Sequence, residues 1–235
     1  MDAEHAEHAG QVGSGTPREV AQEAVAAASR RLAEEGLLVG TAGNVSLVLD
    51  GPTGTEVAIT PTGMVLAEAR AEDVAVVDLD GVHLAGPLAA TSELDLHLTV
   101  LRERGGAVVH THSVVATALS LVVDELPCVH YQQLSIGGAV RVAPFAVFGT
   151  PELAASVHEA MSGKQAAILA HHGTVAAGAT LAKAVENALL LEWAADLYHR
   201  ARAIGEPREL SEAQQVAVIE AALARGYGST RPAEG

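Results

Sequence analysis

The chain has 235 residues, a length that suits one domain, and no break in its composition marks a second domain. Hydrophobic residues make up 49% of the chain but aromatic residues only 3%, so the core must be built mainly from Ala, Val and Leu. The formal charge of −15 opposes nucleic acid and anionic membranes as partners.

The N-terminal segment is small, polar and Gly-containing. Residues 1–15 are therefore expected to form a disordered tail ahead of a single domain over 16–235. They carry acids and histidines where a secretion signal needs basic residues followed by an apolar stretch. No uninterrupted apolar run reaches the roughly 18 residues of a membrane span. These features predict a cytoplasmic protein.

Beyond the tail, the predicted elements alternate between helix and strand. Thr16, Pro17 and Glu19 supply the N-cap, first-turn proline and capping-box glutamate of a helix that stops at Gly36. The other predicted helices are 92–104, 151–161, 181–204 and 211–224, and the predicted strands are 44–49, 56–60, 74–79, 107–110, 140–142 and 166–170. Because tight turns join the early strands, we expect one layered α/β domain with a largely antiparallel or mixed central sheet flanked by helices.

Two histidines separated by one residue lie at the end of the predicted strand 107–110. His110 and His112 project from the same face of that strand, so their imidazoles can converge on one cation. Three protein nitrogens and an open position are typical of catalytic zinc. A third ligand must therefore come from elsewhere in the chain, and the single cysteine leaves histidine and carboxylate as the available donors.

His172 is the best candidate for this third ligand, because it follows the apolar strand 166–170 and precedes Gly173, which allows a tight exit. His171 competes with it. Neighbouring residues on an extended segment point to opposite faces, so only one of the two can bind the metal.

Glu93 opens the helix that precedes the histidine pair. A carboxylate beside a divalent cation can be a fourth ligand in the empty site and a proton-transfer group once substrate displaces it. The plainer interpretation is a negative charge placed favourably in the first turn of a helix. His97 lies one turn further along the same helix face, where leucines surround it, and is expected to be a packed core residue.

Three short segments, 40–46, 60–63 and 91–92, are rich in glycine and hydroxyl side chains. Glycine lets the backbone approach a phosphate closely, and a helix N-terminus offers free N–H groups. Together they predict an anion cradle that requires no arginine, which suits a chain with only 14 Lys and Arg residues.

These segments belong to a longer series of motifs: GTAGNVS at 40–46, ITPTG at 59–63, SE at 92–93, VVH at 108–110, HY at 130–131, FGT at 148–150 and HHG at 171–173. In these motifs and their order the chain resembles the class II aldolase/adducin-head family, and within it the L-fuculose-1-phosphate aldolases. The resemblance covers nearly everything outside the tail. It implies zinc-dependent retro-aldol cleavage of a ketose 1-phosphate, such as L-fuculose 1-phosphate, to dihydroxyacetone phosphate and a small aldehyde such as lactaldehyde.

The resemblance also implies roles for individual residues. His110, His112 and His172 would bind Zn²⁺, with Glu93 as fourth ligand and acid/base. Tyr131 would reach the site of a neighbouring subunit in a homotetramer, and Tyr227 would assist at the aldehyde end from a mobile C-terminal tail. Ala224 stands where related aldolases carry a tail aromatic, which weakens the match to the fuculose pocket. The implied phosphate contacts are Gly43, Asn44, Thr62, Gly63, Thr91 and Ser92.

Other functions remain open. One is a 5-deoxypentulose 1-phosphate aldolase in salvage, and another is a related sugar-phosphate epimerase or dehydratase. The corresponding epimerases typically carry Asp where this chain has Glu93. The three histidines with Glu93 also argue against a non-enzymatic adducin-like role. The two lysines, Lys164 and Lys183, lie outside the motifs, which disfavours imine-forming aldolases.

Overall fold

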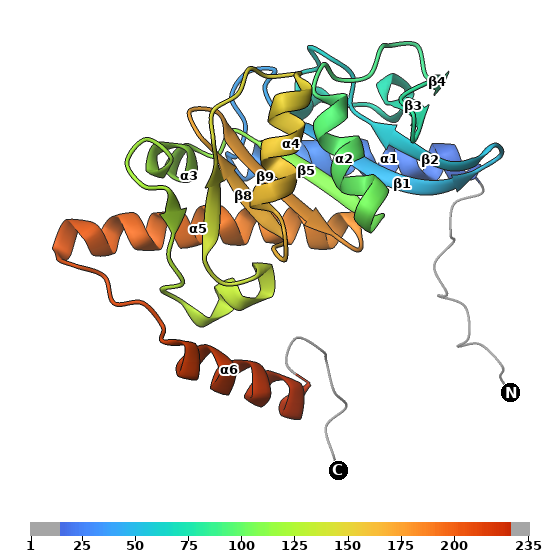
Figure 1. Ribbon diagram of the computed structural model, residues 1–235. Helices are drawn as coiled ribbons and strands as arrows, with labels where there is room; N and C mark the ends of the chain where they lie inside the picture. Colours follow the sequence, from blue (N-terminus) through green and yellow to red (C-terminus); the bar gives the residue numbers. More distant parts are fainter. Residues whose placement is uncertain (1–14, 227–235) are drawn as a thin grey trace, which may run out of the picture.

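A mixed sheet organises the chain, whose computed structural model describes residues 15–226. Within this range nine strands follow the order β4-β3-β2-β1-β5-β9-β8-β7-β6 (Figure 1). Only the β7–β8 pair is parallel among the pairs in these residues. The strands are β1 (Asn44–Gly51), β2 (Gly54–Ile59), β3 (Ala75–Asp78), β4 (His83–Ala85), β5 (Ala107–Thr111), β6 (Glu125–Leu126), β7 (Val140–Ala143), β8 (Ala166–Leu169) and β9 (Gly173–Gly178). The largely antiparallel sheet predicted from the sequence is confirmed.

Helices cover both faces of the sheet. The α-helices are α1 (Pro17–Glu34), α2 (Leu94–Arg104), α3 (Val114–Leu119), α4 (Pro151–Ala160), α5 (Leu181–Ile204) and α6 (Glu212–Arg225), and the 3-10 helices are η1 (Leu66–Glu68), η2 (Ala71–Asp73) and η3 (Tyr131–Ile136). One apolar cluster joins the sheet to α1, α3 and α5, and a second joins it to α2 and α4 (Figure 1). On β5, Val109 belongs to the first cluster and Val108 to the second, because successive side chains point to opposite faces.

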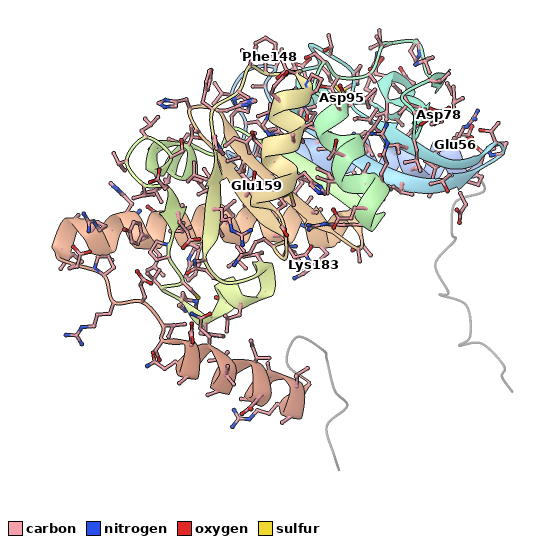
Figure 2. All side chains as sticks on the ribbon, in the orientation of Figure 1. Glu56, Asp78, Asp95, Phe148, Glu159 and Lys183 are labelled. Carbon is pink, nitrogen blue, oxygen red and sulfur yellow. The ribbon has the colours of Figure 1, made fainter. Side chains whose placement is uncertain are left out.

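The first helix is fixed by the contacts that its sequence predicts and by one ion pair. Thr16 and Glu19 form the expected capping box. Arg18 then makes two hydrogen bonds to Glu56 of β2, with Nε–Oε2 and Nη2–Oε1 distances of 2.7 Å each. Figure 2 shows Glu56 on the β1–β2 hairpin. The Glu56 side chain is fully buried. This pair ties α1 to the β1–β2 hairpin.

Several elements differ from the sequence predictions. The strands β4, β6 and β9 and the helices α3 and η3 were not expected. β9 has the sequence GTVAAG, in which glycine and alanine outnumber the two β-branched residues and polar residues do not alternate with apolar ones, and it becomes a strand because it fits between β5 and β8. The helix expected at 92–104 begins at Leu94. Residues 1–14 and 227–235, and with them Tyr227, lie outside the described residues, so the division into 1–15 and 16–235 stays a prediction.

No helix among residues 15–226 has the length and apolar character that crossing a bilayer requires.

Three neighbouring strands meet at one edge of the sheet. Because β1, β5 and β9 are adjacent and antiparallel, the start of β1, the end of β5 and the start of β9 lie side by side. The cross-strand pairs are Asn44 with His110 and Thr111 with Thr174. Most of the site residues expected from the sequence lie at this edge.

Candidate metal centre

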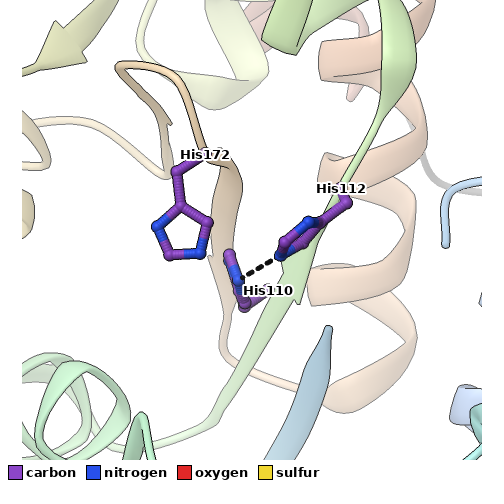
Figure 3. A group of neighbouring side chains, drawn as sticks. All are labelled: His110, His112 and His172. Carbon is purple, nitrogen blue, oxygen red and sulfur yellow. Dashed lines mark hydrogen bonds between the residues drawn. The ribbon is translucent and has the colours of Figure 1, made fainter. Parts of the chain in front are cut away.

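Three histidine rings converge at the sheet edge. His110 is the fourth residue of β5, His112 follows the end of that strand, and His172 comes from the turn between β8 and β9 (Figure 3). One ring nitrogen from each lies within 4.8 Å of the others. The three pairs of ring centroids are 5.0, 4.9 and 5.1 Å apart. The expected convergence of His110 and His112, derived from the two-residue period of a strand, is therefore seen.

The turn brings His172 to the cluster in a way that the sequence argument did not foresee. His171 is not extended but has a φ of 58°, in the left-handed region that a non-glycine residue rarely occupies. Its backbone N–H donates to Ser120 Oγ at 3.0 Å, which holds the turn. His171 is exposed while His172 faces the other rings. Only one of the two enters the site, but because of a left-handed turn rather than the alternation of a strand.

Gly173 is required at this turn by space rather than by conformation. A Cβ added there would lie 2.2 Å from the Thr111 carbonyl oxygen and 3.3 Å from His110 Cε1. The backbone of β9 therefore lies directly against the strand that carries His110.

Glu93 completes the group. It is the residue before α2, yet its side chain makes no capping hydrogen bond to the helix. Its Oε2 lies 3.3 Å from His110 Nε2, and its Oε1 lies 3.3 Å from His172 Nε2. The residue is only 7% exposed. The carboxylate thus faces the histidines, and the plainer interpretation, a charge that caps the helix, does not describe its position.

The unpaired atoms of this group fit a divalent cation. His110 Nδ1 lies 2.9 Å from the Thr174 carbonyl, which can only accept, so Nδ1 carries the hydrogen and Nε2 presents a lone pair. His112 Nε2 lies 3.2 Å from His110 Nε2. Glu93 Oε1 is buried without a hydrogen-bond partner, a costly state that a cation would relieve. Three imidazole nitrogens and a carboxylate are suitable donors for zinc.

Burial sets the protonation states. Burial, and then the neighbouring His110 and His172, lowers the pKa of His112 to about 4. Burial likewise lowers the pKa of His172. Burial alone would raise the pKa of Glu93, but the contact with His110 and the hydrogen bond from Asn44 outweigh it and hold that pKa below its ordinary value. In their neutral form His112 and His172 can offer nitrogen lone pairs to a metal beside the ionised carboxylate.

The expected phosphate residues gather beside Glu93. Thr62 Oγ1 accepts the Ser92 N–H at 3.0 Å, and Thr91 Oγ1 accepts the Glu93 N–H at 3.2 Å. These two backbone N–H groups are therefore already hydrogen-bonded, whereas the sequence predicted free N–H groups at the start of the helix. A hydroxyl that accepts keeps its own hydrogen for donation. The donors on this segment are thus side-chain hydroxyls, and those of Thr62 and Ser92 are on exposed residues.

The two glycines of the cradle differ in their surroundings. Gly43 is buried, has a φ of 98° and lies so close to the end of β5 that a Cβ would be 3.0 Å from the His110 carbonyl oxygen. Gly63 is exposed, and its added Cβ would meet nothing within 4 Å. Gly43 therefore packs against the strand that carries His110, whereas Gly63 faces solvent.

Tyr131 is the first residue of η3, in the segment between β6 and β7. It is 41% exposed, and its ring lies 4.6 Å from that of His130. With residues of α5 and α6 it lines a groove, Leu190 and Ile219 among them. The sequence assigned it to a neighbouring subunit's site, and one chain alone does not test that role.

His97 makes contacts that the sequence did not predict. His97 is buried, as expected of a core residue, but both of its ring nitrogens are hydrogen-bonded, to Ser46 Oγ at 2.7 Å and to Asn44 Oδ1. Its position one helical turn after Glu93 was visible in the sequence. Its partners were not, because they lie about 50 residues earlier in the chain.

Known proteins resemble this chain in sequence and in fold. A profile of the family described as "Class II Aldolase and Adducin N-terminal domain" matches residues 23–199. The 5-deoxy-D-ribulose 1-phosphate aldolase of Bacillus thuringiensis serovar kurstaki is 37% identical over 193 residues, which cover 81% of this chain and 90% of the relative. The L-fuculose phosphate aldolase of Escherichia coli strain K12 is 36% identical over 188 residues, which cover 78% and 85%.

A solved structure of an L-fuculose 1-phosphate aldolase superposes with a TM-score of 0.81 at 32% identity and covers 89% of this chain and 99% of its own. The resemblance predicted from the motifs is confirmed. The chain belongs to the class II aldolase and adducin N-terminal domain family and is a lyase of the class II aldolase type.

Proposed function

We propose that the chain catalyses zinc-dependent retro-aldol cleavage of a ketose 1-phosphate to dihydroxyacetone phosphate and a small aldehyde. The observation that carries this proposal is the buried Glu93 carboxylate, which lies 3.3 Å from His110 Nε2 and from His172 Nε2 within a three-histidine group. This arrangement unites a cation site with a group that can move a proton.

Zn²⁺ would be held by His110, His112, His172 and, in the resting site, Glu93. Neutral nitrogen donors with one carboxylate favour zinc, although cobalt and manganese accept similar donors. When bound, the cation supplies Lewis-acid stabilisation of negative charge on the substrate oxygens. The hydrogen bond from His110 Nδ1 to the Thr174 carbonyl orients one ligand.

The phosphate would be held beside Glu93 by the hydroxyls of Thr62, Thr91 and Ser92, together with the Asn44 side chain and the backbone of Gly43 and Gly63. The segments 60–63 and 91–92 are joined by hydrogen bonds from the Ser92 N–H to Thr62 Oγ1 at 3.0 Å and from the Thr91 N–H to the Thr60 carbonyl at 3.1 Å, so the hydroxyl donors are fixed relative to Glu93. Holding the phosphate there orients the sugar carbons toward the carboxylate and the histidines.

Glu93 moves the proton at C3. In cleavage, the C4 hydroxyl passes its proton to solvent by way of the neighbouring subunit's Tyr131, the C3–C4 bond breaks, and the electron pair of that bond stays on C3 of the phosphate-bearing fragment. Glu93 takes up one proton from solvent and delivers it to C3, so cleavage consumes no net proton. In the reverse direction the ionised Glu93 removes that proton, in keeping with its lowered pKa.

The aldehyde end would be completed by a neighbouring subunit. We infer a homotetramer in which Tyr131 donates a proton to the aldehyde oxygen of an adjacent site, with Tyr227 assisting. The 41% exposure of Tyr131 supports this arrangement. Light scattering on purified protein tests the tetramer, and a monomer with full activity would contradict it.

Two substrates fit the proposal, and they differ only in the aldehyde. L-fuculose 1-phosphate would release lactaldehyde, and a 5-deoxypentulose 1-phosphate would release acetaldehyde. The first is the substrate in the name of the E. coli relative, and a sugar of the second kind is the substrate in the name of the B. thuringiensis relative. The greater similarity to the second makes the 5-deoxypentulose sugar the first to assay.

The test is turnover of zinc-loaded protein on both sugars, with dihydroxyacetone phosphate coupled to its NADH-dependent reduction. An EDTA-treated sample and its zinc-restored counterpart are the controls. Release that disappears with EDTA and returns with zinc supports the proposal, and the ratio of kcat/KM values identifies the aldehyde. A metal-loaded protein that releases none contradicts it and favours an epimerase or dehydratase.

A further inference from the structure

A buried chain of hydrogen bonds runs behind Glu93. Ser46 Oγ lies 2.7 Å from His97 Nδ1, and His97 Nε2 contacts Asn44 Oδ1. Asn44 Nδ2 lies 2.9 Å from Glu93 Oε2 and 3.2 Å from Thr91 Oγ1. The exposed fractions are 0% for Ser46 and His97 and 4% for Asn44. Water therefore does not replace any of these contacts.

The sheet brings this chain together. Alternation along β1 sends Val45 to the cluster under α1 and α5, so Asn44 and Ser46 point to the opposite face, toward α2. α2 carries His97 on the side that packs against the sheet, and Glu93 precedes it by one helical turn. One strand, one helix and the loop before that helix thus supply consecutive members of one hydrogen-bonded chain.

Only one arrangement of hydrogens satisfies every contact. An ionised Glu93 can only accept, so Asn44 must turn its Nδ2 toward the carboxylate and its Oδ1 toward His97. His97 Nε2 must then donate. Burial lowers the pKa of His97 to about 3, so the ring is neutral and its Nδ1 accepts from Ser46. Reversing the Asn44 amide would place two acceptors, Asn44 Oδ1 and Glu93 Oε2, against each other.

We propose that His97 is a positioning residue which, through Asn44, fixes the Glu93 carboxylate for proton transfer. The proposal rests on the acid/base function proposed for Glu93. Both ring nitrogens of His97 are bonded to the segment 40–46, through Ser46 and Asn44, so His97 acts on Glu93 by setting the Asn44 amide. The same amide reaches Thr91 Oγ1, so the chain joins the carboxylate to the phosphate segment.

The first test compares His97→Leu with His97→Gln. Leucine has no donor, whereas the glutamine amide places an N–H near the position of imidazole Nε2. We expect kcat to fall about 10- to 100-fold in His97→Leu, the range typical for residues that orient metal-site groups, and within a few-fold of wild type in His97→Gln. KM should rise less than kcat falls in His97→Leu, because Asn44 is only one of the proposed phosphate contacts and the Thr62–Ser92 hydrogen bond does not involve it. Equal losses in both variants, or a wild-type kcat in His97→Leu, would overturn the proposal.

A second variant guards against misfolding of His97→Leu. Ser46→Ala removes the donor to Nδ1, which frees His97 to protonate Nδ1 and Asn44 to reverse. We expect a several-fold loss of kcat at unchanged zinc content and melting temperature. Ser29→Ala is the matched control, because Ser29 is also fully buried but donates only to Val25 within α1, and its kcat should equal that of wild type. A Ser46→Ala enzyme with wild-type kcat would contradict the chain.

A readout independent of turnover separates this proposal from the proposed function. ¹⁵N NMR of metal-free, histidine-labelled protein reports the tautomer of His97, assigned by comparison with His97→Gln. A neutral ring with Nε2–H supports the chain, and an Nδ1–H ring overturns it even if the enzyme is active. Conversely, wild-type protein that shows the Nε2–H ring but cleaves no ketose 1-phosphate contradicts the proposed function and leaves the hydrogen-bonded chain standing.

Discussion

Asn44 and His110 are directly opposite each other on the adjacent antiparallel strands β1 and β5. Asn44 holds the Glu93 carboxylate through Nδ2, while His110 faces the same carboxylate oxygen through Nε2. Asn44 therefore holds Glu93 by a hydrogen bond, and His110 places its Nε2 lone pair beside the same oxygen, where a cation would join the two. This explains how a residue outside the sheet, in the loop before α2, is held at a defined place beside the histidines.

Removing a histidine should remove the metal. We expect His112→Ala and His172→Ala to lose at least about tenfold in zinc affinity while they remain folded, because each leaves two imidazoles and a carboxylate. The measurement is zinc bound per chain after dialysis against a weak chelator. His158→Ala is the control, since His158 is exposed and contacts only Glu103 by ion pairing. Undiminished zinc in either site variant would refute the ligand assignment.

Gly173→Ala should disturb the site through the backbone. The added Cβ would lie 2.2 Å from the Thr111 carbonyl oxygen, so β9 must move away from β5. We expect a loss of about 1–3 kcal/mol in the free energy of unfolding, together with weaker zinc binding. Urea unfolding and zinc titration measure both. Gly205→Ala is the control, because a Cβ there meets nothing within 4 Å and the φ of 172° is extended backbone. An unaltered Gly173→Ala protein would mean that the β5–β9 contact is looser than described.

The histidine pair and the capped first helix could be read from the sequence because both depend on local periodicity. Thr16 and Glu19 lie three residues apart, and His110 and His112 lie two apart on a strand, so geometry follows from spacing alone. The left-handed His171 and the strand β9 could not be read in this way. Both depend on the pairing of β9 with β5 on one side and β8 on the other, and the β9 sequence, GTVAAG, has weak strand propensity of its own.

The same limit explains His97. A histidine among leucines on a helix face predicts a core position, and the residue is buried as expected. What the spacing could not supply is the pairing of both ring nitrogens with β1, since that depends on the orientation of α2 across the sheet. The predicted phosphate segments, like the histidine pair, could be found because their glycine and hydroxyl residues lie close together in the sequence. The sequence did not show that the backbone N–H groups of Ser92 and Glu93 are already hydrogen-bonded to threonine hydroxyls.

Acid should weaken the protein through Glu56. Hydrogen bonding to Arg18 is the largest cause that lowers the pKa of Glu56, to about 2, against an ordinary value of 4.5. Because the folded pKa is the lower one, the native state binds fewer protons, so this contribution to stability is complete above about pH 4.5 and is lost as the pH falls toward 2. Arg18→Met should therefore have a lower urea midpoint than wild type at pH 7, with a difference that shrinks below pH 4.5.

The control for this prediction is Arg200→Met, which breaks an exposed pair with Asp196 and should shift the midpoint little at any pH. A difference between wild type and Arg18→Met that stays constant from pH 7 to pH 3 would contradict the assignment of acid sensitivity to Glu56.

Glu93 is proposed to move a proton at a carbon of the substrate beside the three histidines. The most direct test of this claim needs no aldehyde: zinc-loaded protein is incubated with dihydroxyacetone phosphate in D₂O, and proton NMR follows exchange at the hydroxymethyl carbon. Wild type should exchange one hydrogen there. Glu93→Gln, at wild-type zinc content and melting temperature, should exchange this hydrogen at least about 100-fold more slowly, and its turnover should fall by a similar factor. Glu152→Gln, which changes an exposed glutamate of α4, is the control and should match wild type. Exchange at the wild-type rate in Glu93→Gln would contradict the claim.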